Sequence, residues 1–178
     1  MVIKIASLKF STEEEPLFYN VEIDEEGNVR HYNEKGRLHR LDGPAVEETD
    51  GYKAWYVNGK KHRMDGPAVE RPEGTKFWYV NDKRHRLDGP AVIRADGSKE
   101  WWVNNKLHRV DGPAIEYPDG AGTWYYKGKR HRLDGPAVEF SDGDKWWYVN
   151  DKLIGKSMEG FTDEDFEQWK KEHGYENS

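Results

Sequence analysis

The chain has 178 residues, of which 35% are charged, and it carries a net charge of −6 with no cysteine. The absence of cysteine excludes a disulfide scaffold and a thiolate metal site, and the acidic balance argues against a general nucleic-acid or anionic-membrane binder. Eight Trp, ten Tyr and six Phe among few aliphatic residues predict a thin core made mostly of aromatic rings.

Residues 1–38 predict an N-terminal cap. Two strands are expected at 2–10 and 17–23, followed by a degenerate repeat in which Tyr32 takes the position of a Trp and Gly36 that of a turn glycine. The start of the chain lacks the uninterrupted apolar stretch of a signal peptide, and no window of the sequence approaches the roughly 18 apolar residues of a membrane span. We therefore expect a cytoplasmic protein.

Residues 39–153 contain five repeats of 23 residues each. The dipeptide His-Arg recurs at 39–40, 62–63, 85–86, 108–109 and 131–132. Each pair is followed by one apolar residue, by Asp-Gly-Pro-Ala and by a β-branched residue. An acid-Gly turn, an aromatic strand and a second turn such as Asn58-Gly59 then complete the unit. One repeat is therefore two strands and two turns.

Such a fixed period predicts an all-β repeat array, an elongated, twisted or rolled antiparallel sheet that advances about 10 Å per repeat. Side chains alternate across a strand, so Trp55 and Val57 are expected on a packed face and Tyr56 on the other. The second face also carries a variable column, which we expect to be exposed or specialised. Its members are Ala54, Phe77, Glu100, Thr123 and Trp146.

Residues 154–178 predict a C-terminal segment with a capping helix at about 162–173. Thr162 is the expected N-cap, Phe166 and Trp169 share one face, and Gly174 ends the helix. Ile154-Gly155 stands where a sixth His-Arg is expected. Both ends of the array are thus predicted to be capped against end-to-end pairing.

The stretch WYVNGKKHRMDGPAVE at 55–70 resembles the MORN repeat family in its aromatic strand, its Asn-Gly-Lys turn, its histidine and its period. The match is to a variant, because Arg follows the His where Gly is usual and Asp-Gly-Pro-Ala replaces a Gly-x-Gly-like stretch. Repeats of this variant resemble those of bacteriophage, large-virus and bacterial proteins, including an antitoxin-like group. The resemblance implies a rolled antiparallel sheet and an interaction role.

The repeated histidines do not predict a metal or a catalytic site. Equivalent positions in neighbouring repeats lie about 10 Å apart, whereas ligands of one ion lie about 2.0–2.2 Å from it. His39 and Asp42 within one loop are too few for a metal site, and both are expected to satisfy backbone groups. Five near-identical loops also leave no privileged set of catalytic residues. We expect no enzyme activity, no metal and no cofactor.

The loops after the aromatic strands are basic and form what we term the basic loop ladder. Its residues are Lys60, Lys61, His62, Arg63, Lys83, Arg84, His85, Arg86, Lys106, His108, Arg109, Lys129, Arg130, His131 and Arg132. The acid-Gly turns are expected on the opposite edge of the sheet. The basic loop ladder either attracts an acidic protein, a nucleotide or a nucleic-acid backbone, or is solvated surface.

A second candidate surface is the aromatic row, one residue after each repeated Trp. It consists of Tyr56, Tyr79, Trp102, Tyr125 and Tyr148. Either a rolled sheet buries these rings, or they form an exposed row of residue types that are enriched in binding hot spots.

The sequence as a whole predicts a non-enzymatic binding protein with a protein partner. By family resemblance it is a phage or bacterial protein that blocks a host defence factor or toxin. One alternative is a sponge for an anionic nucleotide-type ligand, and another is a structural scaffold. Membrane and nucleic-acid partners are not expected.

Overall fold

The computed structural model describes residues 3–9 and 17–175. The chain is an all-β repeat array with one short C-terminal helix, which confirms the predicted fold class. It divides into two compact units, Met1–His85 and Arg86–Ser178, and each is described by itself.

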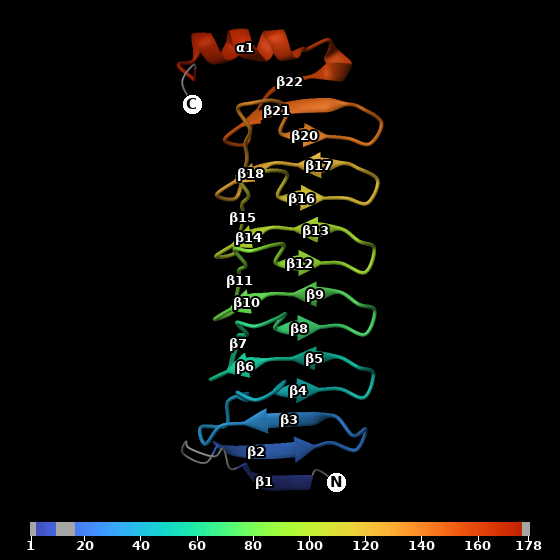
Figure 1. Cartoon of the computed structure of the whole chain (residues 1–178), viewed down its shortest axis with the longest axis vertical. Helices are drawn as coiled ribbons and strands as arrows, with labels where there is room; N and C mark the ends of the chain where they lie inside the picture. Colours follow the sequence, from blue (N-terminus) through green and yellow to red (C-terminus); the bar gives the residue numbers. More distant parts are fainter. Residues whose placement is uncertain (1–2, 10–16, 176–178) are drawn as a thin grey trace. The chain divides into compact units, whose positions relative to one another are not determined.

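The first unit begins with three strands that are longer than most strands of the repeats. They are β1 (Ile3–Lys9), β2 (Leu17–Ile23) and β3 (Val29–Tyr32), and they pair antiparallel in this order (Figure 1). Both predicted N-terminal strands are therefore present, although residues 2 and 10 lie outside the described residues. Gly36 has a φ of 67° in the turn between Tyr32 and Leu38, which form a bridge. The degenerate repeat thus folds as a hairpin.

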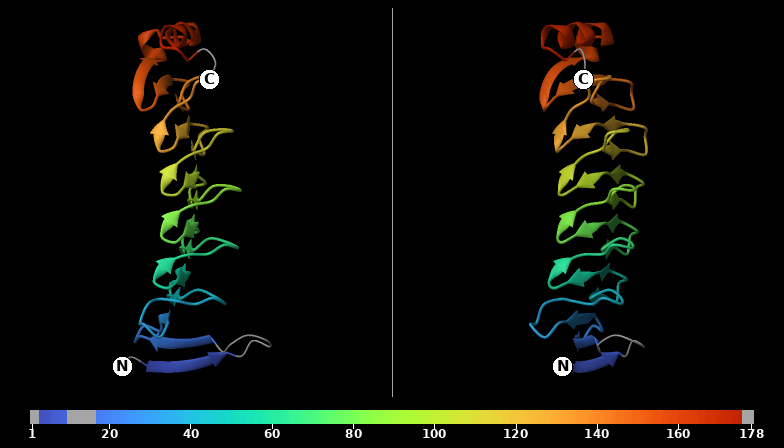
Figure 2. Two further views of the ribbon diagram at one scale, coloured as in Figure 1. Left: turned by 90° about the vertical axis from the view of Figure 1, so that its left-hand side faces the viewer. Right: turned by 60° about the vertical axis from the view of Figure 1, so that its left-hand side comes forward.

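Each repeat adds two strands to a main ladder, one before and one after its acid-Gly turn. The first strands are β4 (Val46–Glu47), β8 (Val69–Glu70), β12 (Val92–Ile93), β16 (Ile115–Glu116) and β20 (Val138–Glu139). The second strands are β5 (Lys53–Ala54), β9 (Lys76–Phe77), β13 (Lys99–Glu100), β17 (Gly122–Thr123) and β21 (Lys145–Val149). Their order is β3-β4-β5-β8-β9 in the first unit and β12-β13-β16-β17-β20-β21 in the second. Equivalent strands of successive repeats lie one above the next within each unit (Figure 2).

The core of the ladder is built on the alanine of Asp-Gly-Pro-Ala. All five of these alanines are 0% exposed, and the next residue is buried in four repeats, as with Val92 at 0%. The alanine N–H donates to the second strand of its own repeat, as from Ala91 to the Glu100 carbonyl at 2.8 Å. Its carbonyl accepts from the Trp of the preceding repeat, as Ala114 does from Trp101 at 2.8 Å. A larger side chain at this fully buried position would have to displace its neighbours.

The aromatic strand is interrupted at the Trp. The following residues form separate two-stranded hairpins: β6 (Tyr56–Val57) with β7 (Lys60–Lys61), β10 (Tyr79–Val80) with β11 (Lys83–Arg84), β14 (Trp102–Val103) with β15 (Lys106–Leu107), and β18 (Tyr125–Tyr126) with β19 (Lys129–Arg130). Asn58 and Gly59 turn the first hairpin with φ values of 53° and 83°, both in the left-handed region that type I′ turns require. In Figure 1 these hairpins lie on the left and the acid-Gly turns on the right of each unit.

The interruption makes one of our expectations wrong. The variable column was expected to be exposed or specialised, yet Ala54 is 0% exposed and Phe77 and Glu100 are each 8% exposed. The Trp joins the two kinds of sheet: the N–H of Trp55 donates to Ala68 of the main ladder, and its carbonyl accepts from His62 after the small hairpin. Because the chain changes sheets at this residue, alternation along a straight strand does not apply.

The second unit ends with a longer hairpin and the predicted helix. β21 pairs with β22 (Lys152–Lys156), and η1 (Ser157–Glu159) leads to α1 (Asp163–Glu172). Thr162 is the N-cap and forms a reciprocal capping box with Asp165. Phe166 is 1% exposed and packs with Trp147. A Cβ at Gly155 would overlap the Phe161 ring, so this position after the last repeat accepts no side chain.

Candidate binding surface of the His-Arg loops

The candidate site is a set of five loops that join one repeat to the next, which we term the His-Arg loops. They cover residues 39–45, 62–68, 85–91, 108–114 and 131–137. Four of them lie between the second strand of a small hairpin and the next strand of the main ladder, and the first follows the bridge at Leu38. Each loop presents the sequence His-Arg-apolar-Asp-Gly-Pro-Ala.

The arginine is the centre of each loop. Arg109 Nε donates to Asp111 Oδ1 at 3.0 Å, and its Nη1 donates to the Pro113 carbonyl at 3.2 Å and to Glu116 Oε1 at 2.6 Å. Its Cζ lies 3.9 Å from the centroid of the Trp101 ring. The hydrogen bond from Arg109 holds the pKa of the Asp111 carboxyl below its usual range. One side chain thus ties together the loop, the strand that follows it and the Trp at the end of the main-ladder strand.

The same contacts recur in the other repeats. The Nε–Oδ1 distances are 3.0 Å for Arg40–Asp42, 2.9 Å for Arg63–Asp65, 3.0 Å for Arg86–Asp88 and 2.8 Å for Arg132–Asp134. The glycine of the motif leaves room for this guanidinium, since a Cβ at Gly112 would lie 3.0 Å from Arg109 Cζ. The Asp and Gly of the motif are therefore explained by the contacts of one arginine.

The histidine connects its loop to the hairpin that ends the same repeat. His131 Nδ1 accepts from the backbone N–H of Asn150 at 3.2 Å, and His39 accepts from Asn58 at 3.0 Å. Burial lowers the pKa of His39 and of His131, as expected for an acceptor nitrogen that must stay unprotonated. Among the described residues, no three His, Cys, Asp or Glu side chains are grouped to hold a metal ion.

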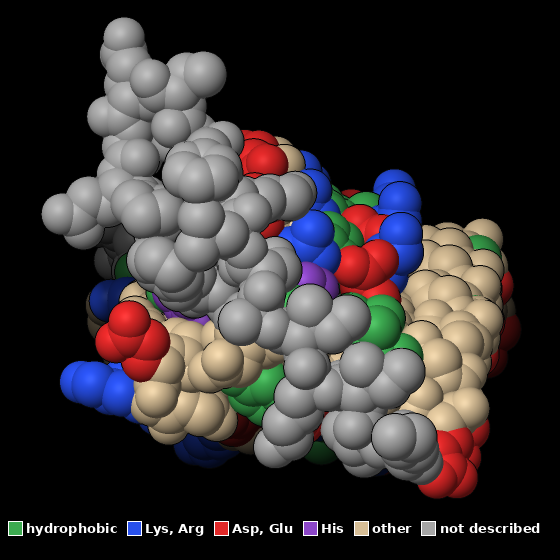
Figure 3. Space-filling model, turned by 90° about the horizontal axis from the view of Figure 1, so that it is seen from below, with side chains coloured by type: hydrophobic (Ala, Val, Ile, Leu, Met, Phe, Trp, Pro, Cys, Tyr) green, Lys and Arg blue, Asp and Glu red, His purple; other side chains and the backbone are tan. Residues whose placement is uncertain are grey.

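The structure places the basic loop ladder beside acidic partners. Four glutamates pair with the loop arginines at N–O distances of 3.0, 3.6, 2.6 and 2.8 Å: Glu47 with Arg40, Glu70 with Arg63, Glu116 with Arg109 and Glu139 with Arg132. Figure 3, which views the molecule from below, shows Lys and Arg side chains next to Asp and Glu side chains at that end as well. The loop arginines are therefore largely occupied, whereas Lys60, Lys83, Lys106 and Lys129 are exposed on the small hairpins.

The aromatic row lies partly inside the fold. Tyr56, Tyr79, Trp102 and Tyr125 are half-buried, and burial raises the pKa of Tyr56 and Tyr125. Trp102 Nε1 donates to Glu100 Oε2 at 2.7 Å. Tyr148 is only 5% exposed and belongs to a buried cluster, so its ring offers little surface to a partner.

Four strongly exposed large apolar side chains were assigned no role from the sequence. They occupy the position between Arg and Asp in the first four loops. Leu41 is 57% exposed, Met64 77%, Leu87 79% and Val110 81%. The signal that could have identified them was available, because an apolar residue stands in the middle of a charged loop in every copy. In the fifth loop the equivalent Leu133 is partly buried and packs against the cluster of Trp147 and Phe166.

Two grooves lie between successive His-Arg loops of the second unit. One of about 550 Å³ lies between loops 85–91 and 108–114 and is lined by Leu87, Val110 and Trp101. The other, of about 650 Å³, lies between loops 108–114 and 131–137 and is lined by Val110, Leu133 and Trp124. Val110 lines both grooves, so the two hollows are neighbours.

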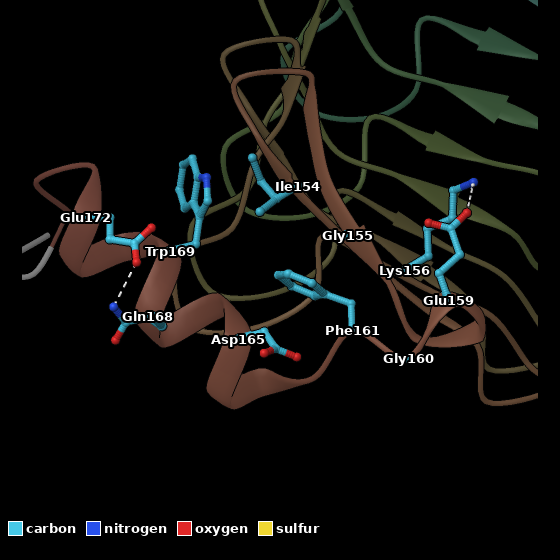
Figure 4. A pocket seen from close by; sticks show the side chains of 10 residues that line it. All are labelled: Ile154, Gly155, Lys156, Glu159, Gly160, Phe161, Asp165, Gln168, Trp169 and Glu172. Atoms are coloured by element: carbon cyan, nitrogen blue, oxygen red, sulfur yellow. Dashed lines mark hydrogen bonds and ion pairs between the residues drawn. The ribbon is translucent and has the colours of Figure 1, made fainter.

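A separate hollow of about 500 Å³ lies beside α1. Three side chains face this space in Figure 4: Ile154 of β22, Phe161 before α1, and Trp169 of α1. Glu159 and Glu172 at its rim pair with Lys156 and Gln168. This hollow lies where α1 packs against the last hairpin.

Comparison with models of known protein families finds no match, and comparison with curated proteins finds none. Within the described part of the chain, no helix is long and apolar enough to cross a membrane.

Proposed function

We propose that the protein acts without catalysis, by holding a protein partner on the His-Arg loops. The observation that carries this proposal is the exposure of a large apolar side chain at one position of successive loops, from 57% for Leu41 to 81% for Val110. Large apolar side chains that gather at a groove mark interaction sites more often than scattered ones do. Leu87 and Val110 line one groove together, so they form such a group.

A protein partner fits these loops better than a nucleotide does. An anionic ligand would have to compete for Arg109 with Asp111 and Glu116, both of which already accept from it. The exposed side chain between Arg and Asp is apolar, and apolar contact is what a protein surface supplies. A nucleotide sponge is therefore the weaker proposal.

The biological role that we propose rests on the resemblance to variant MORN-type repeats of phage and bacterial proteins. In this role the protein is cytoplasmic and blocks a host defence factor or toxin by stoichiometric binding. The resemblance is an analogy between sequence patterns, and the loop surface does not depend on it.

The test is capture of a partner by immobilised protein from host cells, with identification by mass spectrometry. We expect a partner whose retention is lost in the double variant Leu87→Ser, Val110→Ser. Tyr117→Ser is the matched control, because Tyr117 is a 46%-exposed large apolar side chain at an acid-Gly turn rather than in a His-Arg loop. A partner retained equally by all three proteins would contradict the assignment to these loops.

A further inference from the structure

The fifth His-Arg loop shows how a partner can cover the apolar residue of such a loop. Leu133 of this loop packs against the cluster of Trp147 and Phe166, together with Trp169 of α1. It is partly buried there, whereas Leu87 and Val110 at the same position of the preceding loops are 79% and 81% exposed. The chain thus contains one covered copy and several uncovered copies of the same surface.

The helix also makes polar contacts with this loop. Lys170 Nζ donates to the Leu133 carbonyl at 2.8 Å. The hydrogen bond from Arg132 lowers the pKa of Asp134, and the positive charge of Lys170 acts in the same direction. The helix therefore meets the loop through Lys170, and its aromatic residues Phe166 and Trp169 are part of the packing that covers Leu133.

The two preceding loops have the same internal geometry. In all three, the arginine donates from Nε to the Asp and from Nη1 to the carbonyl of the Pro, at 3.0 and 3.3 Å for Arg86, 3.0 and 3.2 Å for Arg109, and 2.8 and 3.1 Å for Arg132. The backbone that Lys170 contacts in the fifth loop is thus presented in the same way in the others. Leu133 lines the groove shared with Val110 and also packs against the cluster that includes Phe166 of α1.

Charge defines the helix further. The side chains of Asp88 and Asp111 are 83% and 78% exposed, one beside each uncovered apolar residue. Each accepts from an arginine yet keeps most of its surface open to solvent. A lysine beside the apolar face of a docking helix would lie near these carboxylates, as Lys170 lies at the carbonyl of Leu133, the residue before Asp134.

We infer that the groove at Leu87 and Val110 binds a basic amphipathic helix of a partner protein, with aromatic residues three positions apart and a lysine directly after the second, as in Phe166, Trp169 and Lys170. This inference rests on the proposed function and gives the chemical class of its partner. The contact is of the helix-in-groove type, in which residues at i, i+3 and i+4 supply the anchors.

The probe is a fluorescein-labelled, helix-stapled peptide with the sequence of residues 161–175, in which Asp163→Lys and Glu164→Lys make it basic. Its binding to the full chain is measured by fluorescence anisotropy. We expect saturable binding that weakens at least about tenfold in Leu87→Ser, Val110→Ser, since each side chain buries apolar area on docking. Tyr117→Ser should bind like the wild type, and the peptide with Phe166→Ala and Trp169→Ala should not bind.

Three outcomes would overturn the inference. They are absence of binding, binding that is unchanged in the loop variant, and binding that survives the loss of both aromatic residues. Sedimentation velocity supplies a fourth: a concentration-dependent dimer that Leu87→Ser, Val110→Ser abolishes would make a second copy of this chain the occupant. If the peptide fails while loop-dependent capture of a cellular partner succeeds, the proposed function stands and the helical partner class falls. If both fail, both fall.

Discussion

Replacing Arg109 tests whether one guanidinium organises its His-Arg loop. Arg109→Lys keeps the charge and most of the stem but removes the planar fork, which donates to Asp111, to the Pro113 carbonyl and to Glu116. The Arg109 side chain is 20% exposed, so water replaces these bonds only in part.

The expected loss follows from the three kinds of contact. The ion pair with Asp111 is worth roughly 0.2–1 kcal/mol, because that carboxylate is 78% exposed. Leaving the Pro113 carbonyl without its donor costs about 1–3 kcal/mol. Weaker stacking on Trp101 adds roughly 0.5–1 kcal/mol. We expect Arg109→Lys to lower the free energy of unfolding by about 2 kcal/mol, and Arg109→Ala by about 3 kcal/mol.

The measurement is urea unfolding followed by tryptophan fluorescence. With a slope of roughly 2 kcal/mol/M, Arg109→Lys should lower the midpoint by about 1 M. Lys129→Ala is the matched control, because Lys129 is an exposed residue of the basic loop ladder, and its loss should cost less than about 0.5 kcal/mol. If Arg109→Lys and Lys129→Ala destabilise equally, the arginine is not the organising residue and our account of the motif fails.

Three further predictions concern other parts of the fold. Burial lowers the pKa of His131 below its value in the unfolded chain, so the folded chain binds fewer protons than the unfolded chain. The free energy of unfolding should therefore fall as the pH drops from 7.5 to 5.0. His131→Gln cannot titrate, so its urea midpoint should fall less over the same pH range. Glu100 is 8% exposed and accepts hydrogen bonds from Arg94 and from the Trp102 indole. Glu100→Gln should therefore lower the free energy of unfolding, measured in urea, by about 2 kcal/mol. If it lowers that free energy no more than Arg94→Gln does, Glu100 is not a buried acceptor on which stability depends. Thr162→Ala removes the N-cap of α1 and should cost about 1 kcal/mol, visible as roughly fivefold faster amide hydrogen exchange in the helix; unchanged exchange would show that packing alone holds it.

The surface that we propose as functional is also the part of the chain where repetition is least needed for stability. A core alanine at 0% exposure recurs because a larger side chain would overpack the ladder, and an arginine that contacts four groups recurs because each contact needs it. An apolar residue that is 81% exposed, such as Val110, buries little of its surface within the fold. Its recurrence as Leu, Met, Leu, Val and Leu is explained if something else covers it.

Local patterns were sufficient to predict the repeat, its turns and its helix. The 23-residue spacing predicted the array, Asn58-Gly59 predicted a tight turn, and Thr162 with Gly174 bounded the helix to within one residue of its observed ends. These features depend on the backbone preferences and hydrogen bonds of residues close together in the chain, so neighbouring residue types determine them.

Three features were decided only by the tertiary structure. The chain changes sheets at Trp55, and Ala54 is buried although the variability of its column had predicted an exposed or specialised surface. Arg109 is paired with Asp111 in its loop and with Glu116 in the following strand, whereas the charge pattern of the sequence had placed it among residues that could attract an anionic partner. Leu133 is covered and Val110 is not, although their loops are alike, because α1 packs on the last repeat alone. Each outcome depends on which residues distant in sequence come within contact distance, and no local pattern contains that information.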